Sequence, residues 1–80
     1  MHELGILRQI LKTVNRVAED KIIPRVKHIV VEVGDASGVV PQYLMKLYPV
    51  AVETYSALKN AELKILVVSG RRLVIKEIGY

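Results

Sequence analysis

The chain has 80 residues, of which 51% are hydrophobic and 25% are charged, and its formal net charge is +4. This is the length of one domain, and so short a chain needs a rich core because it buries only about 60–65% of the surface that its unfolded form exposes. The absence of cysteine excludes disulfides, thiolate catalysis and any zinc site that depends on sulfur.

Three further classes of protein are disfavoured by the way residues are distributed. No apolar run approaches the roughly 20 residues that cross a bilayer, so we expect no membrane insertion. The basic residues are spread along the chain instead of clustered, which argues against a nucleic-acid-binding protein. The N-terminus lacks the basic and apolar segments of a signal peptide, which makes the cytoplasm the expected location.

The first element expected is a helix from Glu3 to about Ala18. Apolar residues recur on one side with a helical period, and polar residues occupy the other side. The apolar positions are Leu4, Leu7, Ile10, Leu11, Val14, Val17 and Ala18. Because the residue before a proline disfavours the α region, the helix should end before Ile23, which precedes Pro24.

Residues 25–34, RVKHIVVEVG, predict a strand because they are β-branched and alternate between two faces. The residues expected on the core face are Ile29, Val31 and Val33. The residues expected on the opposite face are Val26, His28, Val30 and Glu32.

A second helix is expected to begin near Pro41, since proline suits the first turn of a helix. Its apolar stripe consists of Leu44, Leu47, Tyr48, Ala51 and Tyr55. Pro49 lies inside this stripe, where it removes one backbone hydrogen bond and clashes with the preceding turn at a cost of about 3 kcal/mol. The second helix is therefore predicted to be kinked or interrupted.

Two further strands are predicted over residues 61–68 and 72–78, AELKILVV and RLVIKEI. Gly70 at the first central position of a two-residue loop is typical of a type II′ turn, which predicts a tight antiparallel hairpin. In that hairpin Lys64 would face Glu77 and Val68 would face Leu73.

The order α-β-α-β-β predicts an α+β domain, with two helices packed on one face of a three-stranded mixed sheet. The first strand would be parallel to the second, and the third would pair antiparallel with the second. The uncovered face would carry Val26 and Val30. Its apolar character suggests association with another chain, for example as a homo-oligomer.

The chain shows no recognisable catalytic motif, so we expect no enzymatic activity and assign neither catalytic nor cofactor-binding residues. The N-terminus is different, because the terminal amine of Met1, the amide of His2 and its imidazole can close small chelate rings on one cation. Such nitrogen-rich planar ligation suits Ni(II) or Cu(II), and Glu3 offers a carboxylate or a further amide. Alternatively, His2 is an idle polar residue at a frayed end, and Glu3 stabilises the helix N-terminus by roughly 0.3–1 kcal/mol. His28 is a weaker candidate ligand.

Five segments, taken in order over nearly all 80 residues, resemble the hydrogenase nickel-incorporation family, HypA/HybF. They are MHELGI, IVVEVGDASGVVPQYL, YPVAVE, AELKILVVSG and RRLVIKEI. Members of that family are small metallochaperones that bind nickel at a Met-His-Glu terminus and pass it, with a GTPase partner, to the large subunit of nickel–iron hydrogenase; some serve urease. The resemblance implies that Ni(II) is ligated by His2 and by backbone nitrogens of Met1, His2 and Glu3, with the Glu3 side chain as a further candidate.

Two departures from the family pattern bear on this hypothesis. The family inserts a zinc domain with two CxxC motifs between its last two strands, which here would enter near residues 69–72; we expect no zinc, and residues 1–80 correspond to the nickel-binding domain alone. Several relatives also place an acidic residue where this chain has Val40, and Asp35 is a nearby carboxylate. The alternative function is a metal-independent protein-interaction module that has lost metal handling.

Overall fold

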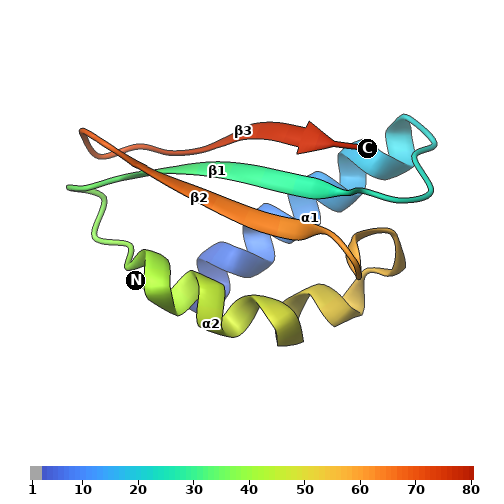
Figure 1. Cartoon of the computed structure of the whole chain (residues 1–80), viewed down its shortest axis with the longest axis horizontal. Helices are drawn as coiled ribbons and strands as arrows, with labels where there is room; N and C mark the ends of the chain where they lie inside the picture. Colours follow the sequence, from blue (N-terminus) through green and yellow to red (C-terminus); the bar gives the residue numbers. More distant parts are fainter. Residues whose placement is uncertain (1–2) are drawn as a thin grey trace.

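The structure, a computed structural model, describes residues 3–80 and consists of a helical layer beneath a three-stranded sheet (Figure 1). In chain order its elements are α1 (Glu3–Asp20), β1 (His28–Gly34), α2 (Pro41–Ala51), η1 (Val52–Thr54), η2 (Ser56–Leu58), β2 (Glu62–Val68) and β3 (Leu73–Gly79). The predicted order of elements and the mixed sheet are confirmed. Within the described residues, neither α1 nor α2 combines the length and the apolar character of a membrane-crossing helix.

Helix α1 extends two residues beyond the predicted end, to Asp20. The residues that it buries are Leu7, Ile10, Leu11, Val14 and Ala18. The helix stops because Ile22 adopts a left-handed backbone conformation, with φ of 55°. The amide of Ile23 then donates a 2.8 Å hydrogen bond back to the carbonyl of Ala18, which satisfies one of the free carbonyls at the helix end.

Strand β1 lies in the centre of the sheet, parallel to β2 on one side and antiparallel to β3 on the other. The predicted hairpin between β2 and β3 is therefore wrong. Both Lys64 and Glu77, which were expected to face each other, are instead register partners of Val30. Likewise Val68 pairs with Gly34, and Leu73 pairs with Val33.

The hairpin prediction fails because the connection of residues 69–72 crosses the end of β1. The amide of Gly34 donates to the carbonyl of Arg72 at 2.7 Å, and the amide of Ala36 donates to the carbonyl of Gly70 at 2.8 Å. A side chain at Gly34 would overlap the Gly70 carbonyl oxygen and would lie 2.9 Å from the Arg72 carbonyl oxygen. The glycine thus provides the space through which β3 reaches the far side of β1.

The predicted core face of β1 is confirmed, since Ile29, Val31 and Val33 are all buried. The prediction for Val26 is wrong, because this residue is buried and not on the outer face. β1 begins only at His28, so the strand alternation does not extend back to Val26. The amide of Val26 instead donates to the carbonyl of Ala57 at 2.9 Å, which holds this segment against η2.

The outer face of the sheet is less apolar than predicted. On it, His28 contacts Glu77 at 2.6 Å between Nε2 and Oε2, and Lys76 lies 3.7 Å from Glu32. These pairs flank the half-buried Val30. The outer face therefore gives no support for association with another copy of the chain. That association stays a prediction.

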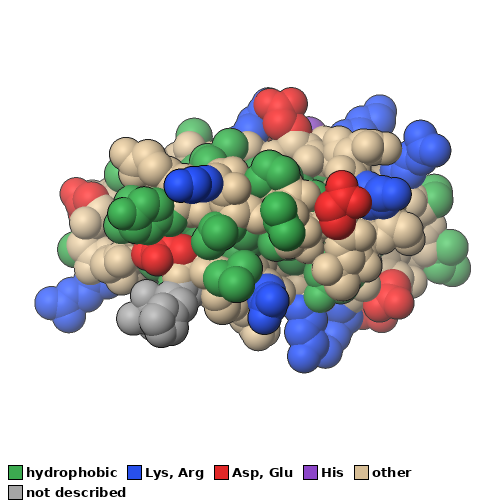
Figure 2. Space-filling view, turned by 90° about the horizontal axis from the view of Figure 1, so that it is seen from below, with side chains coloured by type: hydrophobic (Ala, Val, Ile, Leu, Met, Phe, Trp, Pro, Cys, Tyr) green, Lys and Arg blue, Asp and Glu red, His purple; other side chains and the backbone are tan. Residues whose placement is uncertain are grey.

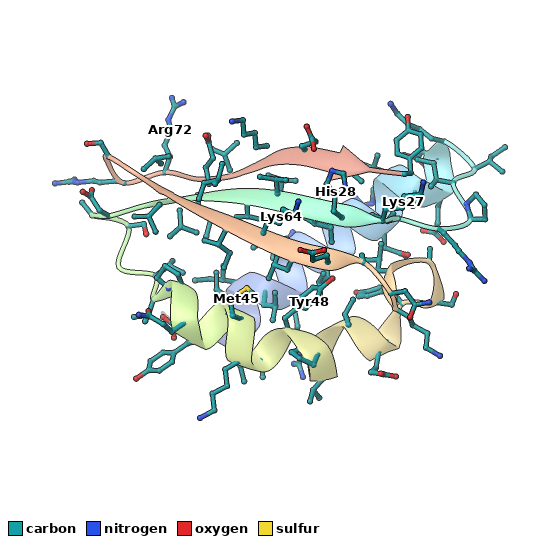
Figure 3. All side chains as sticks on the ribbon, viewed as in Figure 1. Lys27, His28, Met45, Tyr48, Lys64 and Arg72 are labelled. Carbon is teal, nitrogen blue, oxygen red and sulfur yellow. The ribbon has the colours of Figure 1, made fainter. Side chains whose placement is uncertain are left out.

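The second helix was predicted to be kinked or interrupted at Pro49; it is not interrupted there, and the kink stays a prediction. Pro49 lies inside α2, and the α-helix ends at Ala51, where the chain continues into the tighter turn η1. Tyr48, on the buried side of α2, donates a 2.7 Å hydrogen bond from its hydroxyl to the carbonyl of Ala61 (Figure 3). Burial raises the pKa of Tyr48 to about 12. The bond joins α2 to the residue that precedes β2.

Candidate metal centre

The first turns of α1 and α2 are held together by Glu3. Its carboxylate oxygen Oε2 accepts a hydrogen bond of 3.3 Å from the backbone amide of Val40, 37 residues away in sequence. Val40 is the N-cap of α2 and has no side chain that can cap the helix. The Glu3 carboxylate therefore supplies the negative charge and the acceptor that a helix N-terminus favours. The described chain thus begins beside the start of α2.

Of the three residues predicted to form the nickel site, the structure describes Glu3 alone. Met1 and His2 lie outside the described residues. Ligation by the terminal amine, by the backbone nitrogens and by the His2 imidazole therefore stays a prediction. What the geometry adds is the position of Glu3, whose side chain is directed to the Val40 amide.

The weaker candidate ligands both have other partners. His28 is bonded to Glu77 on the outer face of the sheet, and its ring occupies the space above Gly79 (Figure 3). His28 is the first residue of β1 and Asp35 follows its last, so they lie about 23 Å apart along the strand at roughly 3.3 Å per residue. The Asp35 carboxylate accepts a hydrogen bond of 3.0 Å from the amide of Gly70. Within residues 3–80, no group of three or more His, Asp or Glu side chains is arranged to hold a metal ion.

Sequence reasoning missed the role of Val40. It noted only the carboxylate that this position lacks, whereas in the structure the position acts through its backbone amide. No residue type signals such a contact, because every residue except proline carries an amide hydrogen. The one available hint was Pro41, which marks the start of a helix and hence a set of free amides next to it.

Comparison with known proteins identifies the family. The family described as "Hydrogenase/urease nickel incorporation, metallochaperone, hypA" matches residues 1–78. The chain belongs to the HypA family. The resemblance stated from the sequence is thereby confirmed. The expectation of no enzymatic activity is compatible with this result, since HypA proteins are metallochaperones.

The fold is also that of a HypA protein. The solution structure of the Ni metallochaperone HypA from Helicobacter pylori superposes with a TM-score of 0.79 and 15% sequence identity. The match covers 96% of this chain and 72% of that one. At this identity the likeness concerns the fold. A search of curated proteins found no match to the chain.

Proposed function

We propose that the chain binds Ni(II) at Met1, His2 and Glu3 and delivers it for the maturation of nickel–iron hydrogenase. The observation that carries this proposal is the HypA family match, which begins at residue 1 and so includes the Met-His-Glu sequence. The donors available there are the terminal amine, the amide nitrogens and the imidazole, a set that suits Ni(II). Nickel is the cargo in this proposal and not a permanent part of the fold.

The Glu3 contact favours one of the two ways in which this residue can take part. Its carboxylate already accepts a hydrogen bond from Val40, so ligation by the carboxylate would sacrifice that contact. Ligation by the Glu3 backbone nitrogen leaves the carboxylate in place. We therefore assign the backbone of Glu3 to the metal and its side chain to holding the terminus against α2.

Calorimetric titration with nickel tests the site, using protein whose N-terminus is the native Met1. We expect about one bound ion, and loss of binding in His2→Ala and in a variant with one residue added before Met1. His28→Ala is the matched control, since it removes the other histidine of the chain and should leave nickel affinity unchanged. Equal affinity in His2→Ala and in the unaltered protein would contradict the proposal.

The affinity should also depend on pH. Imidazole must be neutral to ligate a metal, so binding should weaken as pH falls through the range near 6.5 in which histidine ordinarily becomes protonated. The same titration repeated across this range measures the effect. A pH-independent affinity would exclude the imidazole as a ligand.

Delivery would involve a nickel-inserting GTPase and the hydrogenase large subunit as partners. We further propose that residues 1–80 represent the nickel-binding domain of a HypA protein, with the zinc domain of relatives entering at residues 69–72. These four residues are exposed at the crossover between β2 and β3. An insertion there would leave the paired parts of both strands intact.

The alternative is a protein-interaction module that no longer handles metal, and the observation in its favour is Val40. At the position where several relatives carry a carboxylate, this chain offers only the amide that Glu3 already occupies. In that case nickel would bind no more tightly than to a free Met-His-Glu peptide. Sizing the protein over a range of concentrations, with and without nickel, would then show association that is independent of the metal.

A further inference from the structure

A groove with an apolar floor runs between α1 and α2 on the helical side of the molecule. Its apolar lining comes from Leu4 of α1, from Leu47, Val50 and Ala51 of α2, and from Tyr55. Val50 is a large aliphatic residue, and it is 80% exposed. Figure 2 shows hydrophobic side chains gathered on this face, with Lys and Arg side chains beside them.

The rim of the groove is basic. Arg8 and Lys12 stand one helical turn apart on α1, and Lys46 stands on α2. Among residues 3–80, no carboxylate lines the groove. The ion pairs found within residues 3–80 join other residues, on the outer face of the sheet, so these three cations have no carboxylate partner in the described part of the chain.

We propose that this groove binds an acidic, amphipathic helical segment of a partner protein. The apolar floor would receive the hydrophobic stripe of that helix, and Arg8, Lys12 and Lys46 would meet its carboxylates. From Leu4 to Lys12 the groove follows α1 for about 12 Å, at 1.5 Å per residue, which matches roughly two turns of a bound helix. The groove begins at Leu4, next to Glu3 of the proposed metal site, but the inference does not depend on nickel ligation.

Two other occupants fit the same surface less well. A second copy docked groove to groove would bring the same three cations together, in a chain whose net charge is already +4. A membrane surface favours a protruding apolar face, whereas here the apolar residues line a concave space between two helices. Binding of a second copy and binding of a membrane surface are two of the alternative results that the following experiment distinguishes.

The test uses the whole chain and a synthetic amphipathic peptide of about 16 residues, or roughly four helical turns, with leucines on one face and glutamates on the other. A second peptide carries lysine in place of each glutamate. We expect the acidic peptide to bind and to shift backbone amide resonances of α1 and α2 that border the groove. The lysine peptide should bind at least about tenfold more weakly, which corresponds to about 1.4 kcal/mol.

The decisive pair of variants is Val50→Glu and Met45→Glu. Both residues are exposed on α2, but Val50 lines the groove and Met45 does not, so the two variants have the same charge and little reason to unfold. We expect Val50→Glu to weaken binding of the acidic peptide by more than about tenfold, and Met45→Glu to change it by less than about twofold. Circular dichroism of both variants confirms that the helices are retained.

Several results would overturn the proposal. These are absence of binding, equal binding of the two peptides, equal effects of the two variants, or resonance shifts confined to the sheet. Binding of phosphatidylserine vesicles through the groove without peptide binding would assign it to a membrane. Self-association with shifts in the groove, again without peptide binding, would assign it to a second copy.

Discussion

Replacing Gly34 by alanine should destabilise the protein more than any other glycine-to-alanine change outside β3. The added Cβ would overlap the Gly70 carbonyl oxygen and would lie 2.7 Å from the Gly70 carbonyl carbon, both of them backbone atoms that cannot rotate away. The crossover would have to lift from β1, which loosens the Gly34 to Arg72 bond, the Ala36 to Gly70 bond and the Gly70 to Asp35 bond. At 0.5–1.5 kcal/mol each, the expected loss is about 1.5–4.5 kcal/mol.

That loss is large for this chain, since an 80-residue domain has an unfolding free energy of about 4–12 kcal/mol. Urea denaturation followed by circular dichroism measures it. Two control variants separate the cost of steric overlap from the cost of an unfavourable backbone conformation. Gly5→Ala has open space in α1 and should stabilise by up to about 1 kcal/mol, whereas Gly38→Ala has open space but a φ of +81° and should cost about 1–2 kcal/mol. If Gly34→Ala cost no more than Gly38→Ala, the close crossover would be refuted.

Substitutions at three further residues test hydrogen bonds that hold the fold together. Burial raises the pKa of Tyr48 from its ordinary value near 10 to about 12. Between pH 10 and 12 the unfolded chain therefore binds fewer protons than the folded chain, and the free energy of unfolding falls as pH rises. Alkaline denaturation should show a loss of up to about 2.7 kcal/mol between pH 10 and 12, absent in Tyr48→Phe; a flat profile in the unaltered protein would contradict it. Without metal, Glu3→Ala should lower the free energy of unfolding by about 0.3–1 kcal/mol. Glu3→Gln should lower it less, because the side-chain amide oxygen of glutamine can still accept the hydrogen bond from Val40. Equal losses in the two variants would exclude that bond. Asp35→Ala should lower the free energy of unfolding by about 0.5–1.5 kcal/mol through loss of the Gly70 bond. It should also speed hydrogen exchange at the Val40 amide, at the other end of the loop of residues 35–40. Unchanged exchange at Val40 would show that the Asp35 bond does not hold this loop.

Periodicity predicted the elements well because it reports which side of an element faces apolar neighbours. The stripe from Leu7 to Ala18 and the alternation from Ile29 to Val33 both describe buried faces, and both are confirmed. The same rule failed at Val26, since alternation applies only inside a strand and β1 starts two residues later. Pro49 predicted an interruption that the structure does not show, since α2 runs through this residue to Ala51.

Strand pairing was mispredicted because it is set by contacts distant in sequence. Gly70 looked like a hairpin residue, and its positive φ of 110° agrees with a turn, but the turn leads β3 across β1. The informative residue was Gly34, whose missing side chain admits the crossover. A glycine at the end of a strand has several explanations, so sequence alone could not select this one.

The candidate site was predicted unevenly for a similar reason. Residue types with metal chemistry are visible in a sequence, which is why His2 and Glu3 were named. The contact between Glu3 and the Val40 amide was not predicted, since a backbone group has no distinctive letter. Nor was the basic-rimmed groove, although the positions of Arg8 and Lys12 one turn apart placed two cations on one side of α1.

The loop of residues 35–40 links the crossover to the proposed nickel terminus. At one end the Asp35 carboxylate holds the Gly70 amide, and at the other the Val40 amide holds the Glu3 carboxylate. Only six residues separate the strand crossover, where we propose that the zinc domain of relatives enters, from the group that fixes the start of α1. In this chain the crossover is closed by residues 69–72 alone, and the Glu3 contact is still made. The contact that holds Glu3 against α2 is therefore made by residues that this chain itself contains, and the nickel proposal depends on one of the same residues, Glu3.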